Sequence, residues 1–151
     1  MVPNALTTYT PADTRVLLGY VKNDKHWRWV EENKLYNLRG YGHRGTVSLE
    51  SKELHAEFII LSDQTNNRST IAKVIDSPEL HSKEEMKRTG YPNPRGIYYC
   101  FCLEFITDEY WSYFCDSELI ERVRSRYTKN KGPVVLSWLD LIKKMEMVRK
   151  N

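Results

Sequence analysis

The run from Ile97 to Ile106, IYYCFCLEFI, is the longest β-type segment of the chain and is apolar at almost every position. Successive side chains of a strand point to opposite faces of its sheet, so this run carries apolar groups on both faces. Such a strand is stable where both faces are covered, which places it near the middle of a sheet. The fold is therefore expected to be organised around a sheet with this strand inside it.

Shorter patterns on either side of this run define the fold class. Asp24 is expected to cap a helix that ends at Asn33, and Ser82 with Glu85 forms a capping-box pattern. Strands are expected over 15–21, 34–39, 56–61 and 69–75, and helices over 25–33, 77–88, 117–127 and after Ser137. This order predicts an α+β fold: a small, curled, mostly antiparallel β-barrel with flanking helices. Residues 1–14 are expected to be a flexible lead-in and 15–151 a single domain.

The stretch from Tyr20 to Gly45 combines aromatic rings with positive charge. It contains two tryptophans, three tyrosines, two histidines and six Lys/Arg residues. Rings stack on bases and cations contact phosphates, so this composition is typical of a nucleic-acid surface. It is equally compatible with an amphipathic helix beside a basic loop, and both interpretations stay open at this point.

The overall composition excludes several classes of protein. The net charge of +3 is small, so a positive field has to come from uneven placement of the cations. No apolar run approaches the roughly 20 residues of a membrane-spanning helix, and the first residues lack the pattern of a signal peptide. The three cysteines fit buried free thiols in a reducing compartment, and a cytoplasmic location is expected.

The motifs of common catalytic sites are absent from the sequence. It has no Gly-rich phosphate loop, no nucleophile elbow and no zinc-protease motif, and His26, His43, His55 and His81 lack metal-ligand spacing. Cys100 and Cys102 alone do not make a metal site. No metal, cofactor or catalytic residue is therefore expected, and an enzyme is the weaker interpretation.

Several segments resemble the PUA-like superfamily, specifically its EVE and YTH branches. The similar pieces are Leu17 to Asn23, the helix that follows, Tyr36-Asn37, Phe58 to Ser62 and the strand TIAKV from Thr70 to Val74. The later YPNPRGIYYCFCLEFI resembles the EVE pattern in which a Tyr-Pro segment introduces a long strand. The resemblance covers roughly residues 15 to 106.

The resemblance implies a small barrel that holds a flipped-out, often methylated base between the barrel and its first helix. YTH domains recognise N6-methyladenine in RNA, whereas EVE-like domains occur with nucleases and in McrBC-type modification-dependent restriction systems. Two positions depart from the family pattern. Tyr36 stands where a tryptophan is usual, and Thr70 stands where a glycine is usual.

Individual residues can be assigned to this implied site, each beside a structural alternative. Tyr36 is a pocket wall or a strand residue packed on the first helix, Asp63 a base-edge acceptor or a turn residue, and Trp29 a stacking platform or a packed ring. The predicted base-binding pocket comprises Tyr20, Lys22, Asn23, Trp29, Tyr36, Asn37, Asp63 and Trp111. The predicted phosphate contacts are Arg39, His43, Arg44 and Arg95. Asp24 is expected to cap and Trp27 to lie in the core.

The function expected from these residues is a reader domain that recognises a modified base in DNA, as the specificity module of a restriction system. Its partners would be DNA carrying the modification and an effector nuclease or NTPase in another domain or subunit. The alternatives are an RNA reader of YTH type, a small enzyme, and a protein-interaction module that uses the same cleft.

Overall fold

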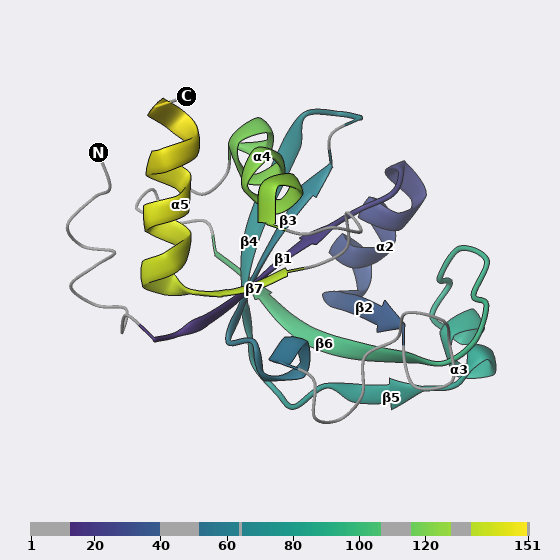
Figure 1. Cartoon of the computed structure of the whole chain (residues 1–151). Coiled ribbons are helices and arrows are strands. Elements are labelled where there is room, and N and C mark those ends of the chain that lie inside the picture. Colours follow the sequence, from purple (N-terminus) through teal and green to yellow (C-terminus); the bar gives the residue numbers. More distant parts are fainter. Residues whose placement is uncertain (1–12, 40–51, 64, 107–115, 128–133, 151) are drawn as a thin grey trace.

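The computed structural model describes residues 13–39, 52–63, 65–106, 116–127 and 134–150 (Figure 1). Its strands are β1 (Arg15–Tyr20), β2 (Leu35–Arg39), β3 (Phe58–Asp63), β4 (Arg68–Val74), β5 (Glu79–His81), β6 (Tyr98–Phe105) and β7 (Val134–Ser137). Its helices are α2 (Asp24–Asn33), the short 3-10 helix η1 (Lys52–His55), α3 (Lys83–Arg88), α4 (Ser117–Tyr127) and α5 (Trp138–Lys150).

All seven strands belong to one curled sheet. Their order is β2-β6-β4-β3-β1-β7, and β5 pairs with β6 beside that path. Strand β1 runs parallel to β3, and the other pairs are antiparallel. The predicted small, mostly antiparallel α+β barrel is confirmed as a curled mixed sheet with helices packed on it. The predicted central strand is confirmed too, because β6 pairs with β2, β4 and β5.

The sheet separates two apolar cores. Along β1 and β3 the side chains alternate, so that Leu17, Ile59 and Leu61 enter one core with α2, β2 and β6. Val16, Leu18 and Ile60 enter the other core, beneath α4 and α5. In Figure 1 these two helices lie together on one side of the sheet, whereas α2 lies on the other side.

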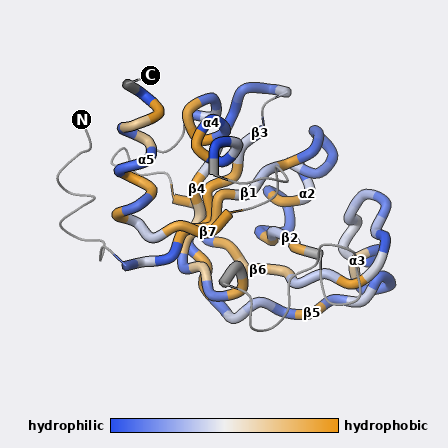
Figure 2. Tube along the Cα trace, in the orientation of Figure 1, coloured by the Kyte–Doolittle hydropathy of each residue, from blue (hydrophilic) through white to orange (hydrophobic). Residues whose placement is uncertain are grey.

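The parallel pair β1–β3 explains why both strands are almost continuously apolar. Each has its interior residues buried, because both faces of the sheet are covered here. Figure 2 shows the same feature as apolar tube along these strands, with hydrophilic residues at the β3–β4 turn and on α3. The sequence pattern alone does not reveal this pairing, because parallel strands are joined by a long crossover connection and not by a short turn.

The helix caps agree with the sequence at two of three positions. Ser82 and Glu85 form the predicted capping box of α3, and the Ser137 hydroxyl accepts a hydrogen bond from the backbone of Asp140 at the start of α5. The cap of α2 is Asn23, not Asp24, because the Asn23 side chain accepts from the backbone N–H of His26. The prediction of Asp24 as the cap was therefore wrong by one residue.

Two short strands differ from the prediction. Residues 79–81 form β5 instead of the first turn of a helix, since the start signal at Ser82 belongs to α3 itself. Strand β7, between α4 and α5, was not predicted; its four residues are only half-buried and are fixed by pairing with β1. Within the described part of the chain, none of the helices has both the length and the apolar character that spanning a membrane demands.

Candidate nucleic-acid interface

The end of β1 and the start of β2 are joined by a tyrosine side chain and not by hydrogen bonds between their backbones. The Tyr36 hydroxyl accepts a hydrogen bond from the backbone N–H of Tyr20 at 3.2 Å and donates one to its carbonyl at 3.1 Å. Gly19 makes this contact possible, because a Cβ atom there would lie 2.7 Å from the Tyr36 hydroxyl oxygen. The barrel is thus held together at this point by one side chain, and the Tyr36 ring is only 2 % exposed.

A buried chain of hydrogen bonds runs from α2 through β2 to the segment before β6. The Nε2 atom of His26 lies 2.9 Å from Oδ1 of Asn37, and the Asn37 amide nitrogen donates to the Tyr91 hydroxyl at 2.9 Å. On its other side, His26 Nδ1 accepts a long hydrogen bond from the backbone N–H of Lys22. These contacts fix the tautomer in which the proton is on Nε2, so each member of the chain has a defined donor or acceptor role.

The protonation of His26 follows from its surroundings. Burial lowers the pKa of His26 below its ordinary value of 6.5, the hydrogen bond to Asn37 raises it, and the charge of Lys22 lowers it further. The net direction is downward, so the imidazole is neutral at pH 7. Burial also raises the pKa of the Tyr36 hydroxyl, which stays protonated.

Aromatic rings enclose this polar chain. The Tyr91 ring meets Trp29 edge-on with centroids 4.9 Å apart, meets His26 in the same manner at 5.6 Å, and packs on Tyr98 at 5.2 Å. The Trp29 indole N–H donates to the Thr89 hydroxyl at 3.0 Å. We call His26, Trp29, Tyr36, Asn37, Tyr91 and Tyr98 the aromatic cluster. Its members come from α2, β2, the segment before β6 and the first residue of β6.

A second group of polar contacts lies where β3 turns into β4. Arg68 bridges the buried Asp63 at 3.0 Å and Asp24 at 2.7 Å, and its guanidinium lies 4.4 Å from the centre of the Trp27 ring. Burial by itself would raise the pKa of Asp63, but hydrogen bonds from Asn66 and Arg68 and the charge of Arg68 bring it below its usual value. Arg68 therefore fastens the β3–β4 turn to the start of α2.

A third group connects the same strand ends to α4. The Ser62 hydroxyl is hydrogen-bonded to the Glu121 carboxylate, and Arg124 binds both oxygens of that carboxylate at 2.6 and 3.2 Å. Arg124 also lies 4.7 Å from the centre of the Tyr20 ring. Glu121 and Arg124 are 3 % and 6 % exposed, so this is a buried ion pair next to the end of β1.

The structure brings most of the predicted pocket residues together. Tyr20, Asn23, Trp29, Tyr36 and Asn37 lie in or against the aromatic cluster. Lys22 is exposed at its edge, and Asp63 lies apart from it, in the Arg68 contacts. The buried position of Trp29 and Tyr36 agrees with the structural alternative of each, and a role in stacking stays a prediction.

The predicted phosphate contacts are only partly described. Arg95 is exposed, and its backbone N–H donates to the Tyr98 hydroxyl at 3.1 Å. Arg39 belongs to β2, but its side chain lies outside the described residues, as do His43, Arg44 and Trp111 altogether. Exposed Lys22 and Arg95 thus adjoin the aromatic cluster at two different points. Among the residues that the structure describes, no three His, Cys, Asp or Glu side chains gather as metal ligands would.

Comparison with known proteins gives matches in structure alone. No protein-family model matches the chain, and no curated protein matches it. The structure is similar to that of a mutant of ZmASCH from Zymomonas mobilis, with 11% identity over 91% of this chain and 99% of that one and a TM-score of 0.48. It is also similar to the Pho92 YTH domain in complex with m6A, with 10% identity over 94% of this chain and 90% of that one and a TM-score of 0.44. Neither similarity assigns a ligand or an activity to this chain.

Sequence reasoning missed several residues of the site. The sequence predicted no specific role for His26, which is one of four histidines. It predicted none for Arg68, Glu121 and Arg124 either. Arg68 could have been suspected, since a cation directly after a turn that starts with Asp63 is well placed to pair with it. Glu121 and Arg124 gave no such signal, because an i, i+3 pair on a helix usually lies in solvent.

Proposed function

We propose that this chain binds nucleic acid and reads a modified base at the junction of β1, α2 and β2. The observation that carries the proposal is the arrangement at that junction. Exposed Lys22 and Asn23 lie directly beside a buried cluster of rings that contains a His–Asn–Tyr hydrogen-bond chain. A barrel that only has to pack does not need a buried hydrogen-bond chain beside exposed polar residues. Such a chain is costly unless every member is bonded.

The residues at the edge of the cluster suit recognition of a base edge. Asn23 uses its Oδ1 atom to cap α2, and among the described residues its amide nitrogen has no partner. That NH₂ group is available to donate to a base, and Lys22 is the residue proposed to contact a phosphate. Val21, between β1 and Lys22, donates its backbone N–H to the Ser62 carbonyl, and the Asn23 carbonyl accepts from the Trp27 N–H, so the backbone on both sides of Lys22 is held in place.

An extruded base also needs a surface on which to stack. Extraction costs a few kcal/mol, and one base–ring stack returns about 1–3 kcal/mol. Tyr36 and Trp29 are the rings proposed for this role. Because both are buried, entry of a base requires a rearrangement that uncovers one of them.

The sequence resemblance supports the finer part of the proposal. It makes DNA with a methylated base the first substrate to test, with this chain as the specificity module of a modification-dependent restriction system. An effector nuclease or NTPase would then be a separate domain or subunit. An RNA reader of N6-methyladenine is the alternative, and in both cases the chain binds without catalysing a reaction.

A binding panel tests the proposal. A duplex and a single strand, each as DNA and as RNA, are compared unmodified, with 5-methylcytosine, with 5-hydroxymethylcytosine and with N6-methyladenine. One modified form is expected to bind more tightly than its unmodified counterpart. Equal affinity for every pair would remove the reader function, and turnover of any oligonucleotide with a divalent metal ion would assign an enzyme instead.

A substitution at Asn23 connects that panel to the proposed site. Asn23→Ser keeps a good helix cap but removes the amide, so we expect unchanged stability and about three- to tenfold weaker binding of the preferred oligonucleotide. Asn33→Ser, at the other end of the same helix, is the matched control and should leave affinity unchanged. Identical affinities for wild type and Asn23→Ser would move the site away from this junction.

A further inference from the structure

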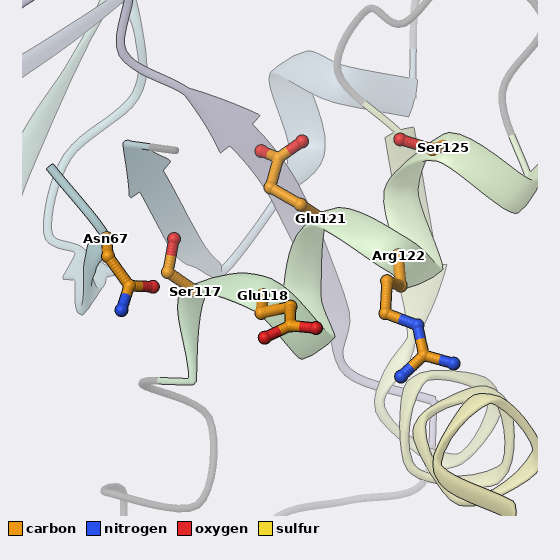
Figure 3. A pocket seen from close by; sticks show the side chains of 6 residues that line it. All are labelled: Asn67, Ser117, Glu118, Glu121, Arg122 and Ser125. Carbon is orange, nitrogen blue, oxygen red and sulfur yellow. The ribbon is translucent and has the colours of Figure 1, made fainter. Parts of the chain in front are cut away.

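A cavity of about 380 Å³ lies beside α4, away from the aromatic cluster. It is lined by Asn67 from the β3–β4 turn and by Ser117, Glu118, Glu121, Arg122 and Ser125 from α4. Figure 3 shows the Ser117 hydroxyl and the Glu121 carboxylate pointing to the same side of the helix, with the Asn67 amide opposite Ser117. Its volume is in the lower part of the range of small-molecule sites.

Ser117 gives the first indication that this cavity has a ligand. The residue is only 4 % exposed, and its Oγ atom has no hydrogen-bond partner among the residues that the structure describes. It is not needed as a helix cap, because the Asp116 carboxylate accepts the backbone N–H of Leu119 at 3.1 Å. A buried hydroxyl without a partner is unfavourable and rare, which points to a group that reaches the cavity and satisfies it.

The charges around the cavity favour a neutral ligand. Glu121 is already neutralised by Arg124, so it is a hydrogen-bond acceptor without a net charge to offer. Arg122 donates to the carbonyl of Val148, and in Figure 3 its guanidinium points toward α5 and away from Ser117. An anion would meet the exposed Glu118 carboxylate, and a cation would meet no other uncompensated negative charge among the described lining residues. The remaining groups are hydroxyls, an amide and acceptor oxygens.

Such a lining matches the hydroxyl groups of a sugar. A sugar hydroxyl donates to a carboxylate and accepts from a serine or amide at the same time, and acidic side chains recognise ribose hydroxyls in dinucleotide sites. None of the described residues that line the cavity carries an aromatic ring, so these residues offer no surface on which a base could stack. The 2′-hydroxyl is the group by which a protein distinguishes RNA from DNA at a given position.

A series of contacts links the cavity to the proposed base site. Glu121 is hydrogen-bonded to Ser62 at the end of β3, and its partner Arg124 lies over the ring of Tyr20. The backbone of the same Tyr20 holds the hydroxyl of Tyr36 in the aromatic cluster. One residue thus connects the proposed base site with the cavity.

We propose that the cavity beside α4 binds a ribose through its hydroxyls, with Ser117 as the contact to the 2′-hydroxyl. The proposal rests on the reader function above and, within it, favours the alternative of RNA over DNA. The ribose could come from the bound strand or from a free ribonucleoside, since the hydroxyl chemistry is the same.

Two separate ratios test the proposal. Binding is measured for four single strands of one sequence: ribose and deoxyribose, each with and without N6-methyladenine. The ratio of ribose to deoxyribose affinity should be about three- to tenfold, the range of one hydrogen bond. The ratio of modified to unmodified affinity reports on the reader function alone. Equal affinity for the two sugars would overturn the ribose site even where the modification is recognised.

Ser117→Ala provides the decisive variant. Because the hydroxyl has no partner in the described part of the chain, its removal should leave the melting temperature unchanged or higher while the sugar ratio falls to about one. Ser69→Ala is the matched control, since Ser69 Oγ is also buried without a partner but does not line the cavity. An unchanged sugar ratio in Ser117→Ala would show that the cavity holds only water.

Two further arms complete the experiment. Asn67 has a φ of 47°, which glycine adopts readily, so Asn67→Gly removes the amide without straining the turn and should also lower the sugar ratio. Free adenosine and 2′-deoxyadenosine identify the source of the ribose. Competition by adenosine alone, lost in Ser117→Ala, would assign the same site to a free ribonucleoside.

Discussion

The hydroxyl of Tyr36 both accepts from and donates to the backbone of Tyr20, so one side chain joins two strands that have no ladder between them. Strand β2 pairs with β6, and β1 pairs with β3 and β7. The contact therefore takes the place of the backbone pairing that would close the barrel. The hydroxyl of Tyr36 thus stabilises the fold, whereas its ring is the part proposed to stack on a base.

Tyr36→Phe should destabilise the protein by about 1–3 kcal/mol, because it leaves the N–H and carbonyl of Tyr20 without this partner. The ring is retained, so any stacking on a base is retained as well. Urea unfolding measures the stability, and the modified and unmodified oligonucleotides measure the binding. Unchanged stability would mean that water replaces the hydroxyl without loss. A large loss of binding at full stability would show that the hydroxyl itself contacts the ligand.

Gly19→Ala should be destabilising by about 1–3 kcal/mol, because the new methyl group would overlap the Tyr36 hydroxyl and approach Leu61 at 3.0 Å. Thermal unfolding of the single variants and of the double variant with Tyr36→Phe provides the check. The double variant should be more stable than the sum of the two effects predicts, since the nearest atom is then absent. Strict additivity would contradict the close contact.

His26 should make the stability depend on pH. Its folded pKa lies below the ordinary value of 6.5, so between the two values the unfolded chain binds more protons than the folded one. The free energy of unfolding is therefore full above pH 6.5 and falls as the pH drops toward the folded pKa. His26→Gln removes this titration while retaining a hydrogen-bonding side chain near Asn37. Parallel profiles for wild type and variant between pH 5 and 7 would show that His26 titrates normally.

The two cysteines of β6 should differ in reactivity. Burial raises the pKa of Cys100 to about 12, and the pKa of the half-buried Cys102 is also raised. At pH 8 Cys100 should therefore resist alkylation in the native protein, and Cys102 should react slowly. Peptide mass spectrometry assigns the labelled residue, which keeps Cys115 apart from both. Rapid labelling of Cys100 without unfolding would place β6 at an edge of the sheet.

Binding to duplex DNA or to RNA should weaken with salt if Lys22 contacts a phosphate. The logarithm of the affinity falls with the logarithm of salt concentration by about 0.9 per contact on a duplex and about 0.7 on a single strand. Lys22→Ala should reduce that slope by the amount that corresponds to about one phosphate contact. Lys143 is an exposed cation on α5, and Lys143→Ala should leave the slope unchanged. Affinity that is independent of salt would argue against nucleic acid altogether.

The sequence by itself determined the elements with strong local signals. The two-faced apolar run of β6, the capping box at Ser82 and the cap at Ser137 depend on residues a few positions apart, so periodicity and local hydrogen bonding are sufficient to predict them. The stretch from Tyr20 to Gly45 was also recognisable as a place where aromatic rings and positive charges gather.

Only the tertiary structure decided which of those groups meet and which are buried. The parallel pairing of β1 with β3, the strand β7, the bridge from Tyr36 to Tyr20 and the ion pair of Glu121 with Arg124 beside Ser62 all join residues that the curled sheet and the packing of α4 bring together. Tyr20 and Tyr36 are 16 residues apart in the chain, and Ser62 and Glu121 are 59 residues apart. Local sequence carries no signal for such contacts, because the same side chains would be satisfied by water in any other arrangement.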